Sequence, residues 1–228
     1  MRLCIFADIH GNAPAFRAAY KSILTEAADV NVFAGDLCGY YYDQIAIYEE
    51  LRSVPNLVAI RGNHDKMFLA LIDGDEDLRR QYAARYGRSM EHLMDSDHTN
   101  LLAWLRELPE QVMIDDVSIA VYHGAPWNVN EGYVYPDSPL EEFRAYRSSC
   151  FVLAHTHYSM VRSIDDKLVV NPGSLGQPRN GKGPSYAVFE STTKDFIVKE
   201  FSYDKAELLK RIAQIGDTNT YIRKILDR

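Results

Sequence analysis

The fold of this chain is decided by its first dozen residues, which read RLCIFA at positions 2–7 and DIHGN at positions 8–12. Apart from Arg2, the first six are apolar and a polar turn follows them at once, which predicts a buried strand. Residues 13–28 are amphipathic, with Pro14 near their start, where proline favours a helix. The order of strand, polar loop and helix indicates an α/β fold.

The same pattern recurs twice. Residues 29–34 repeat the strand signal and end in GD at positions 35–36, residues 43–53 are helical, and residues 56–60 form a third strand that ends in RGNHD at positions 61–65. Such alternation predicts a mostly parallel sheet, in which ligands bind beyond the carboxyl ends of the strands. We therefore expect the three polar loops to meet at one edge.

The sequence pattern changes in the middle of the chain. Residues 66–109 are helical and charged, with breaks expected at Gly74 and Gly87, and predict a helical insertion that can cap the sheet edge. Residues 205–215 predict an amphipathic helix, which residues 221–226 can prolong. Between these regions, strands that imply a second sheet are expected at 111–114, 117–122, 151–154, 160–164, 168–170, 186–190 and 196–201.

Composition is that of an ordinary globular chain, and 228 residues with 46% hydrophobic content fit one domain, residues 1–228, that includes the insertion. The formal net charge of −7 repels phosphate backbones, so duplex nucleic acid is not an expected partner. Cys4, Cys38 and Cys150 are scattered and read as reduced, packed thiols. Because no signal peptide or membrane span is evident either, we expect a cytoplasmic protein without membrane contact.

Five of the seven histidines follow a predicted strand, whereas His92 and His98 lie in the insertion and read as surface residues. The members of two pairs, Asp8 with His10 and the two histidines of the HTH stretch at 155–157, are one residue apart. In an extended segment both members of each pair would reach a common ion. Oxygen and imidazole donors suit Mn²⁺, Fe²⁺, Ni²⁺ or Zn²⁺. The side chains expected at the sheet edges are Asp8, His10, Asp36, Asn63, His64, Asp65, His123, His155 and His157.

In order and spacing, these blocks resemble the calcineurin-like metallophosphoesterase superfamily, from residue 1 to about residue 179. The stretches GDLCGY at 35–40 and NPGSLGQPR at 171–179 resemble its small prokaryotic phosphodiesterase branch. Many of the smallest members carry a cysteine where this chain has His64, and Ala154 stands where the family usually has glycine. The resemblance implies an α/β fold with a two-sheet β-sandwich flanked by helices, interrupted here by the helical insertion.

The resemblance also implies a role for each block. Two divalent ions, with Mn²⁺ the leading expectation, would supply hydroxide for hydrolysis of a phosphodiester or phosphomonoester. His64 would lie beside the substrate phosphate, and Asp65 would orient the ring of His64. A scaffold that keeps the fold without catalysis is the alternative, and the complete set of ligand positions argues against it. The implied ligands are Asp8, His10 and His157 for one ion, Asn63, His123 and His155 for the other, and Asp36 as the bridge.

Substrate contacts are expected from Arg179, Asn12, Trp127 and Tyr40. Arg179 follows a Gly/Pro-rich loop and can bind phosphate in a bidentate way, although a solvated loop charge is an equal alternative. Trp127 opens an aromatic stretch, residues 127–135, that can stack a base or aryl group, form rim packing or contact another subunit. Tyr40 can narrow the pocket or help to hold the insertion. The expected substrate is a small phosphate ester, with nucleotides among the candidates, and the oligomeric state is not readable.

Overall fold

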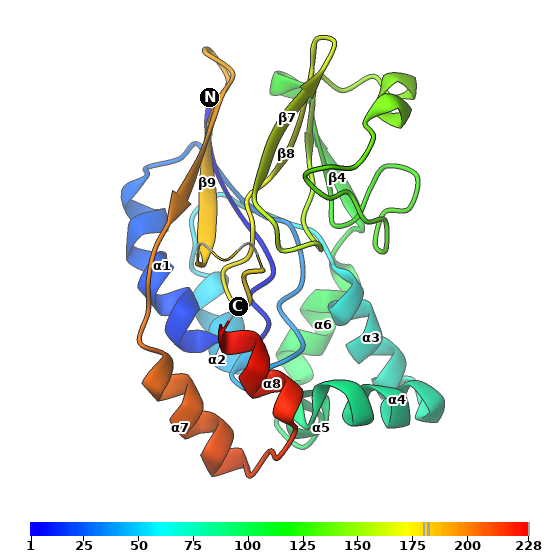
Figure 1. Cartoon of the computed structure of the whole chain (residues 1–228), viewed down its shortest axis with the longest axis vertical. Helices are drawn as coiled ribbons and strands as arrows, with labels where there is room; N and C mark the ends of the chain where they lie inside the picture. Colours follow the sequence, from blue (N-terminus) through cyan, green and yellow to red (C-terminus); the bar gives the residue numbers. More distant parts are fainter. Residues whose placement is uncertain (180, 182, 228) are drawn as a thin grey trace.

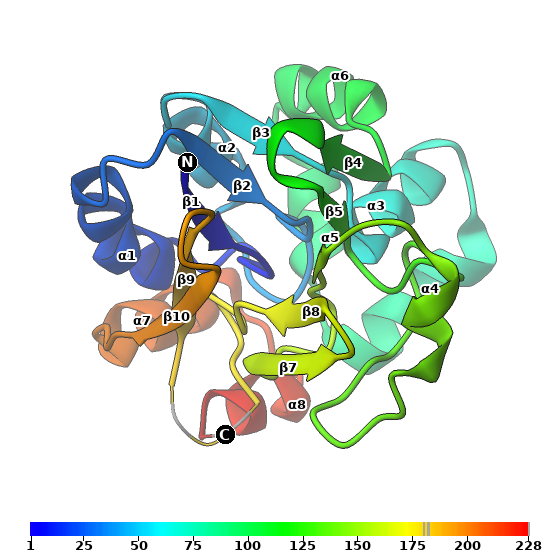
Figure 2. The same ribbon diagram turned by 90° about the horizontal axis from the view of Figure 1, so that it is seen from above.

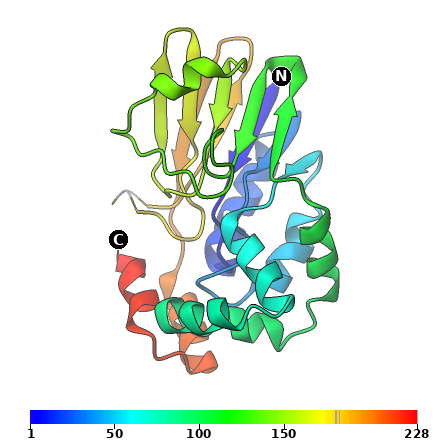
Figure 3. The same ribbon diagram turned by 90° about the vertical axis from the view of Figure 1, so that its right-hand side faces the viewer.

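The computed structural model describes residues 1–179, 181 and 183–227. Two five-stranded sheets pack against each other, with helices beside and below them (Figures 1 and 3). The first sheet has the strand order β10-β9-β1-β2-β3 and contains β1 (Arg2–Phe6), β2 (Val30–Phe33), β3 (Leu57–Ala59), β9 (Ser185–Glu190) and β10 (Asp195–Glu200). The second has the order β4-β5-β6-β8-β7 and contains β4 (Gln111–Ile114), β5 (Ile119–Tyr122), β6 (Cys150–Val152), β7 (Met160–Ile164) and β8 (Lys167–Asn171). The predicted sandwich is confirmed.

Both sheets are mixed. Strands β1, β2 and β3 pair in parallel, as do β5, β6 and β8, whereas β9, β10, β4 and β7 pair antiparallel. Apart from Arg2, strand β1 is apolar because both of its faces are covered. Leu3 and Ile5 pack between the sheets, and Cys4 and Phe6 pack under the helices. The parallel central strands bring the loops after β1, β2, β5 and β6 to one end of the sandwich.

The helices are α1 (Ala13–Thr25), α2 (Gln44–Leu51), α3 (Asn63–Ile72), α4 (Glu76–Tyr86), α5 (Ser89–Met94), α6 (Thr99–Glu107), α7 (Lys205–Ile215) and α8 (Thr220–Lys224). Short 3₁₀ turns add η1 (Asp115–Val117), η2 (Glu141–Ala145) and η3 (Ile225–Asp227). Residues 66–109 are helical, with the expected breaks at Gly74 and Gly87, both with positive φ, and one further break between α5 and α6. The turn η1 shortens the strand expected from residue 117. Viewed from above, the loop between β5 and β6 covers the outer face of the second sheet (Figure 2).

The C-terminal segment differs from the prediction. Gly216 is left-handed and ends α7, so residues 221–226 do not prolong that helix but form α8 and η3. Asp217 is buried and accepts hydrogen bonds from the hydroxyl of Tyr42 (2.9 Å) and the backbone N–H of Arg88 (2.6 Å). The bond from Arg88 anchors the tail to the insertion, and the bond from Tyr42 anchors it to the loop after β2. No described helix is long and apolar enough to cross a membrane.

The loop after β8 supports the loop after β1. The backbone N–H of Leu175 donates to the carbonyl oxygen of Ala7 (3.0 Å), and that of Gly176 donates to the carbonyl oxygen of Asp8 (2.9 Å). A Cβ at Gly176 would lie 1.9 Å from the carbonyl oxygen of Ile9. The close approach of two backbones at this point therefore requires glycine.

We expect Gly176→Ala to lower the free energy of unfolding by about 3 kcal/mol, because its methyl group displaces the loop that carries Asp8. Urea denaturation measures the change. Gly74→Ala is the control, since its Cβ would meet nothing within 4 Å and costs only left-handed strain, about 1 kcal/mol. Equal losses in the two variants would contradict the close approach.

Candidate functional site

The strand ends bring the predicted site residues together. Two groups of three buried side chains have ligand atoms within 4.8 Å of one another, namely Asp8 with His10 and His157, and Asp36 with His123 and His155. The groups adjoin, since Nε2 of His10 lies 3.7 Å from Oδ2 of Asp36. Nε2 of His123 lies 3.2 Å from that same oxygen. We call these six residues the His/Asp cluster.

The backbone of the cluster is strained. Five of its six residues have a left-handed backbone, which is unfavourable for residues with a Cβ: Asp8, His10, Asp36, His155 and His157, with φ between 53° and 66°. The assumption of extended pairs was therefore wrong. His157 joins the group of Asp8 and His10, whereas His155 joins the other group. This division is the one that the family resemblance implied.

Three histidines of the cluster are oriented by the main chain. Nδ1 of each lies within hydrogen-bonding distance of a carbonyl oxygen, so Nδ1 carries a proton, and Nε2 of the neutral ring offers its lone pair on the side of the carboxylates. This is the tautomer that a metal ligand needs. The pairs are His10 with Cys38 (2.8 Å), His123 with Ala34 (2.8 Å) and His157 with Gln177 (2.5 Å).

The carboxylates of the cluster lack donors. Both oxygens of Asp8, Oδ2 of Asp36 and Nε2 of His155 are buried without a hydrogen-bond partner among the described residues. A buried carboxylate oxygen without a donor is costly. Divalent cations would satisfy these atoms, and the mixture of oxygen and imidazole donors suits borderline ions. The residues present therefore fit a metal centre.

Electrostatics indicate the same need for positive charge. Burial, together with the neighbouring Asp36, raises the pKa of Asp8 to about 8. Burial lowers the pKa of His155 to about 3. Burial alone would also lower the pKa of His123, but the negative charge of Asp36, whose Oδ2 lies 3.2 Å from Nε2 of His123, raises it to about 9. Without a bound cation, protons on Asp8 and His123 would balance the charge of the two carboxylates, and divalent cations would take their place.

The start of α3 lies against the cluster. Oδ1 of Asn63 is 3.0 Å from Nε2 of His123, as expected of a residue that shares an ion with it. The backbone N–H of His64 donates to Oδ1 of Asp36 (2.8 Å). The ring of His64 lies 4.9 Å from that of His10, between centroids, and burial lowers its pKa to about 4. His64 is therefore neutral at neutral pH and faces the cluster.

Asp65 does not orient the ring of His64. Nδ1 of His64 instead lies 3.3 Å from the hydroxyl of Tyr82, a residue of α4 that the sequence analysis did not single out. Asp65 is a loop clamp, and its position as the third residue of a helix is typical of such capping carboxylates. Its oxygens accept hydrogen bonds of 2.9–3.0 Å from the backbone N–H groups of Asp36, Cys38 and Gly62.

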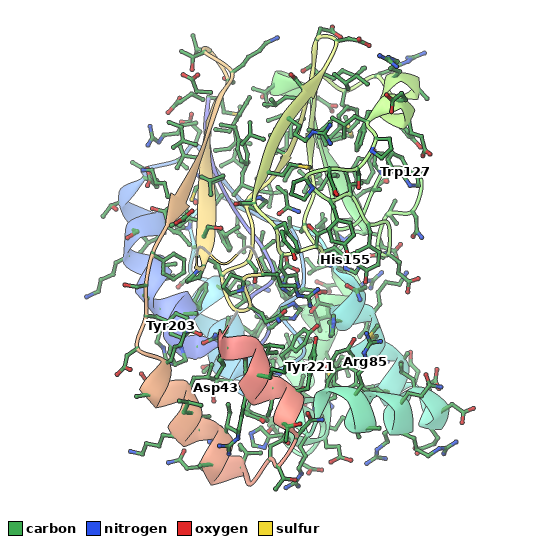
Figure 4. The ribbon with its side chains drawn as sticks, viewed as in Figure 1. Asp43, Arg85, Trp127, His155, Tyr203 and Tyr221 are labelled. Carbon is green, nitrogen blue, oxygen red and sulfur yellow. The ribbon has the colours of Figure 1, made fainter. Side chains whose placement is uncertain are left out.

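A cavity of about 290 Å³ opens beside the cluster. In Figure 4, His155, Arg85 and Tyr221 lie near one another between the sheets and the helices. The insertion and the tail thus form part of the wall, although their helical pattern did not reveal which residues face the cavity. The lining residues are Asp36, Tyr40, Asn63, His64, Met67, Arg85, Tyr86, Asn128, Glu131, Tyr133, His155, Arg179 and Tyr221.

Two of the four expected substrate contacts line this cavity. Arg179 and Tyr40 do so, and Nη2 of Arg179 donates to the hydroxyl of Tyr40 (3.0 Å). The other two do not. Asn12 is fully buried, where it caps α1 and donates to the carbonyl oxygen of Gly176 (2.7 Å). Trp127 makes an edge-to-face contact with Phe143 and is not among the residues that line the cavity.

Cys38, His92 and His98 pack against neighbouring residues and do not take part in the cluster. Cys38 is a buried free thiol whose pKa burial raises, so it is a wall residue rather than a ligand. His92 and His98 are half-buried instead of exposed, and their rings pack edge-on against Tyr42 and Phe68. Neither belongs to the cluster.

The comparisons with known proteins agree with this geometry. Residues 1–194 match the model of the calcineurin-like phosphoesterase superfamily domain. The chain belongs to this superfamily. It is 26% identical to an uncharacterized protein of Methanocaldococcus jannaschii, over 93% of this chain and 92% of the relative. It is 22% identical to a phosphodiesterase of the same archaeon, over 86% of this chain and 96% of the relative.

The fold of this superfamily also recurs among solved structures. A metallophosphoesterase from Sphaerobacter thermophilus superposes with a TM-score of 0.80 at 23% identity, over 100% of this chain and 99% of that one. The coverage includes the insertion and the tail. The helices that wall the cavity are therefore part of an arrangement shared with that superfamily member.

We expect Asp65→Asn to lower the free energy of unfolding by about 2–3 kcal/mol, because the amide turns a donor toward backbone N–H groups in a buried site. Tyr82→Phe removes a hydroxyl that contacts Nδ1 of His64 and accepts from the backbone N–H of Tyr40 at 3.2 Å, and should lose about 1 kcal/mol. Urea denaturation of both variants compares them. A loss in Asp65→Asn no greater than in Tyr82→Phe would contradict the clamp.

Proposed function

We propose that this protein hydrolyses a small phosphate ester with a dinuclear metal centre. The observation that carries the proposal is the pair of adjoining buried groups, with unpartnered ligand atoms, beside a cavity. The proposed ligands are Asp8, His10 and His157 for one ion, Asn63, His123 and His155 for the other, and Asp36 between them.

Asp36 is suited to bridge because Oδ2 lies 3.7 Å from Nε2 of His10 and 3.2 Å from Nε2 of His123, one histidine from each group. Two divalent cations so held would lower the pKa of a water between them and neutralise phosphate oxygens. The donors suit Mn²⁺, which we propose first, and also Fe²⁺, Ni²⁺ or Zn²⁺.

The chain's own groups bind and orient the phosphate. His64 is neutral, so its free ring N–H stabilises the charge that develops on the leaving oxygen. Arg179 is held by two hydrogen bonds to Oε1 of Gln177 and one to Tyr40, which keeps a fixed guanidinium in the cavity wall for a phosphate oxygen. Tyr40 closes the cavity beside His64, with ring centroids 5.0 Å apart.

Two observations support a small ester as the substrate, and a third favours a diester. A cavity of about 290 Å³ is at the lower end of small-molecule sites. The net charge of −7 opposes a nucleic-acid duplex. The phosphodiesterase relative is similar over 86% of this chain. All proposed ligand positions converge, which favours catalysis over a scaffold role.

We expect the protein loaded with Mn²⁺ to hydrolyse bis(p-nitrophenyl) phosphate faster than p-nitrophenyl phosphate, and a chelator to abolish both activities. The measurement is p-nitrophenolate release in a panel that also includes nucleotide monoesters and diesters. Activity that survives exhaustive chelation would refute the metal centre, whereas a faster monoester would reverse only the diester preference.

We expect His64→Ala to lower kcat by a factor of about 10² to 10⁴ while it keeps its metal, because the ring acts on the leaving oxygen. Asp36→Ala should lose metal and activity together. Metal analysis and steady-state kinetics on both variants test this, with His98→Ala as the control outside the cluster. Unchanged turnover in His64→Ala would remove the assigned role.

A further inference from the structure

We infer that the substrate carries a planar aromatic group, such as a nucleobase, and that Tyr133 is the surface on which this group stacks. The inference rests on the proposed function, since it takes the His/Asp cluster as the site of the phosphate. It assigns Tyr133 a role in substrate specificity, and the proposed hydrolysis itself does not require this residue.

Tyr133 lies next to the cluster and is largely uncovered. Its ring centroid is 4.2 Å from that of His155, and it lines the same cavity as His64. Even so, 54% of Tyr133 is exposed. A large aromatic side chain left open at the mouth of a polar cavity is a ready contact for an apolar ligand group.

Tyr133 is also held in a fixed orientation. Tyr135 stacks on it with the rings 9° from parallel and 5.7 Å between centroids, and the edge of Tyr158 contacts Tyr135. Because the ring of Tyr133 already contacts Tyr135 and His155, it loses little freedom when a base binds to its exposed area. Stacking on such a platform is favourable for any nucleobase, because every base has a π-face.

The rest of the wall suits the charged part of the same ligand. Arg85 and Arg179 line the same cavity as Tyr133, so two guanidinium groups are available to the phosphate of a ligand that contacts this ring. Arg85 has no acidic partner among the described side chains, and its guanidinium lies over the ring of Tyr86 (4.9 Å). Aromatic and cationic surfaces in one small cavity match a nucleotide better than an alkyl phosphate.

An aromatic residue of this loop could instead pack at the rim of the cavity, and Trp127 is the residue that packs in this way. Trp127 is 41% exposed but packs on Phe143 and lies away from the described cavity wall, farther along the sandwich in Figure 4. Trp127 is therefore a matched aromatic control for Tyr133.

The test is calorimetric titration of the Mn²⁺-loaded protein with adenosine 5′-monophosphate and with ribose 5-phosphate, which lacks the base. We expect the nucleotide to bind at least about 10-fold more tightly. Tyr133→Ala should abolish this ratio and leave ribose 5-phosphate binding unchanged, which also shows that the cluster is intact. Tyr133→Phe and Trp127→Ala should keep the ratio.

Equal affinities in the unaltered protein, including no detectable binding of either compound, would overturn the inference, as would a ratio that survives Tyr133→Ala. Failure of the proposed function has a different signature. The ester panel would then show no metal-dependent turnover, while the binding ratio and its loss in Tyr133→Ala would still be measured without catalysis.

Discussion

Two buried carboxylates, Asp8 and Asp36, face the imidazoles of four histidines without hydrogen-bond donors for three of their four oxygens. The rest of the site depends on this unbalanced charge. In a low-dielectric interior, charged carboxylates are unfavourable unless a cation is bound or a proton is taken up. The raised pKa of Asp8 shows that its protonated form is favoured when no cation is bound. An arrangement that is poor for stability is therefore well suited to holding metal.

The surrounding fold supports this arrangement with rigid backbone contacts. Left-handed residues hold the ligands at angles that regular strands do not offer, and each such residue costs free energy that packing elsewhere must offset. Asp65 clamps the loop of Asp36, and Gly176 lets a second backbone support the loop of Asp8. The central strands β1, β5 and β6, which are buried on both faces, supply the packing.

The proposed metal ligands and the outer wall of the cavity come from different parts of the chain. The cluster and Asn63 follow β1, β2, β3, β5 and β6, all at one end of the sandwich. The outer wall of the cavity comes from segments far apart in sequence, with Arg85 on α4, Tyr133 in the loop after β5 and Tyr221 on α8. The bond from Arg88 to Asp217 joins the insertion to the tail, so these two segments are positioned together.

Local pattern was enough to predict the strands, the helical insertion with its breaks at Gly74 and Gly87, and the meeting of the polar loops, because strand period and turn residues are properties of short segments. The division of the histidines between two groups was not predictable from spacing, since the left-handed backbone at His155 and His157 depends on contacts with distant loops.

Tertiary contacts also decided the roles of Asp65, Asn12 and Trp127, and the presence of Arg85 and Tyr221 in the cavity wall. Which side a helix turns toward a cavity, and which partner a buried polar group finds, are settled only when the elements pack together. Residue type and order therefore indicated the chemistry that we propose for the centre, and three-dimensional packing determined what surrounds it.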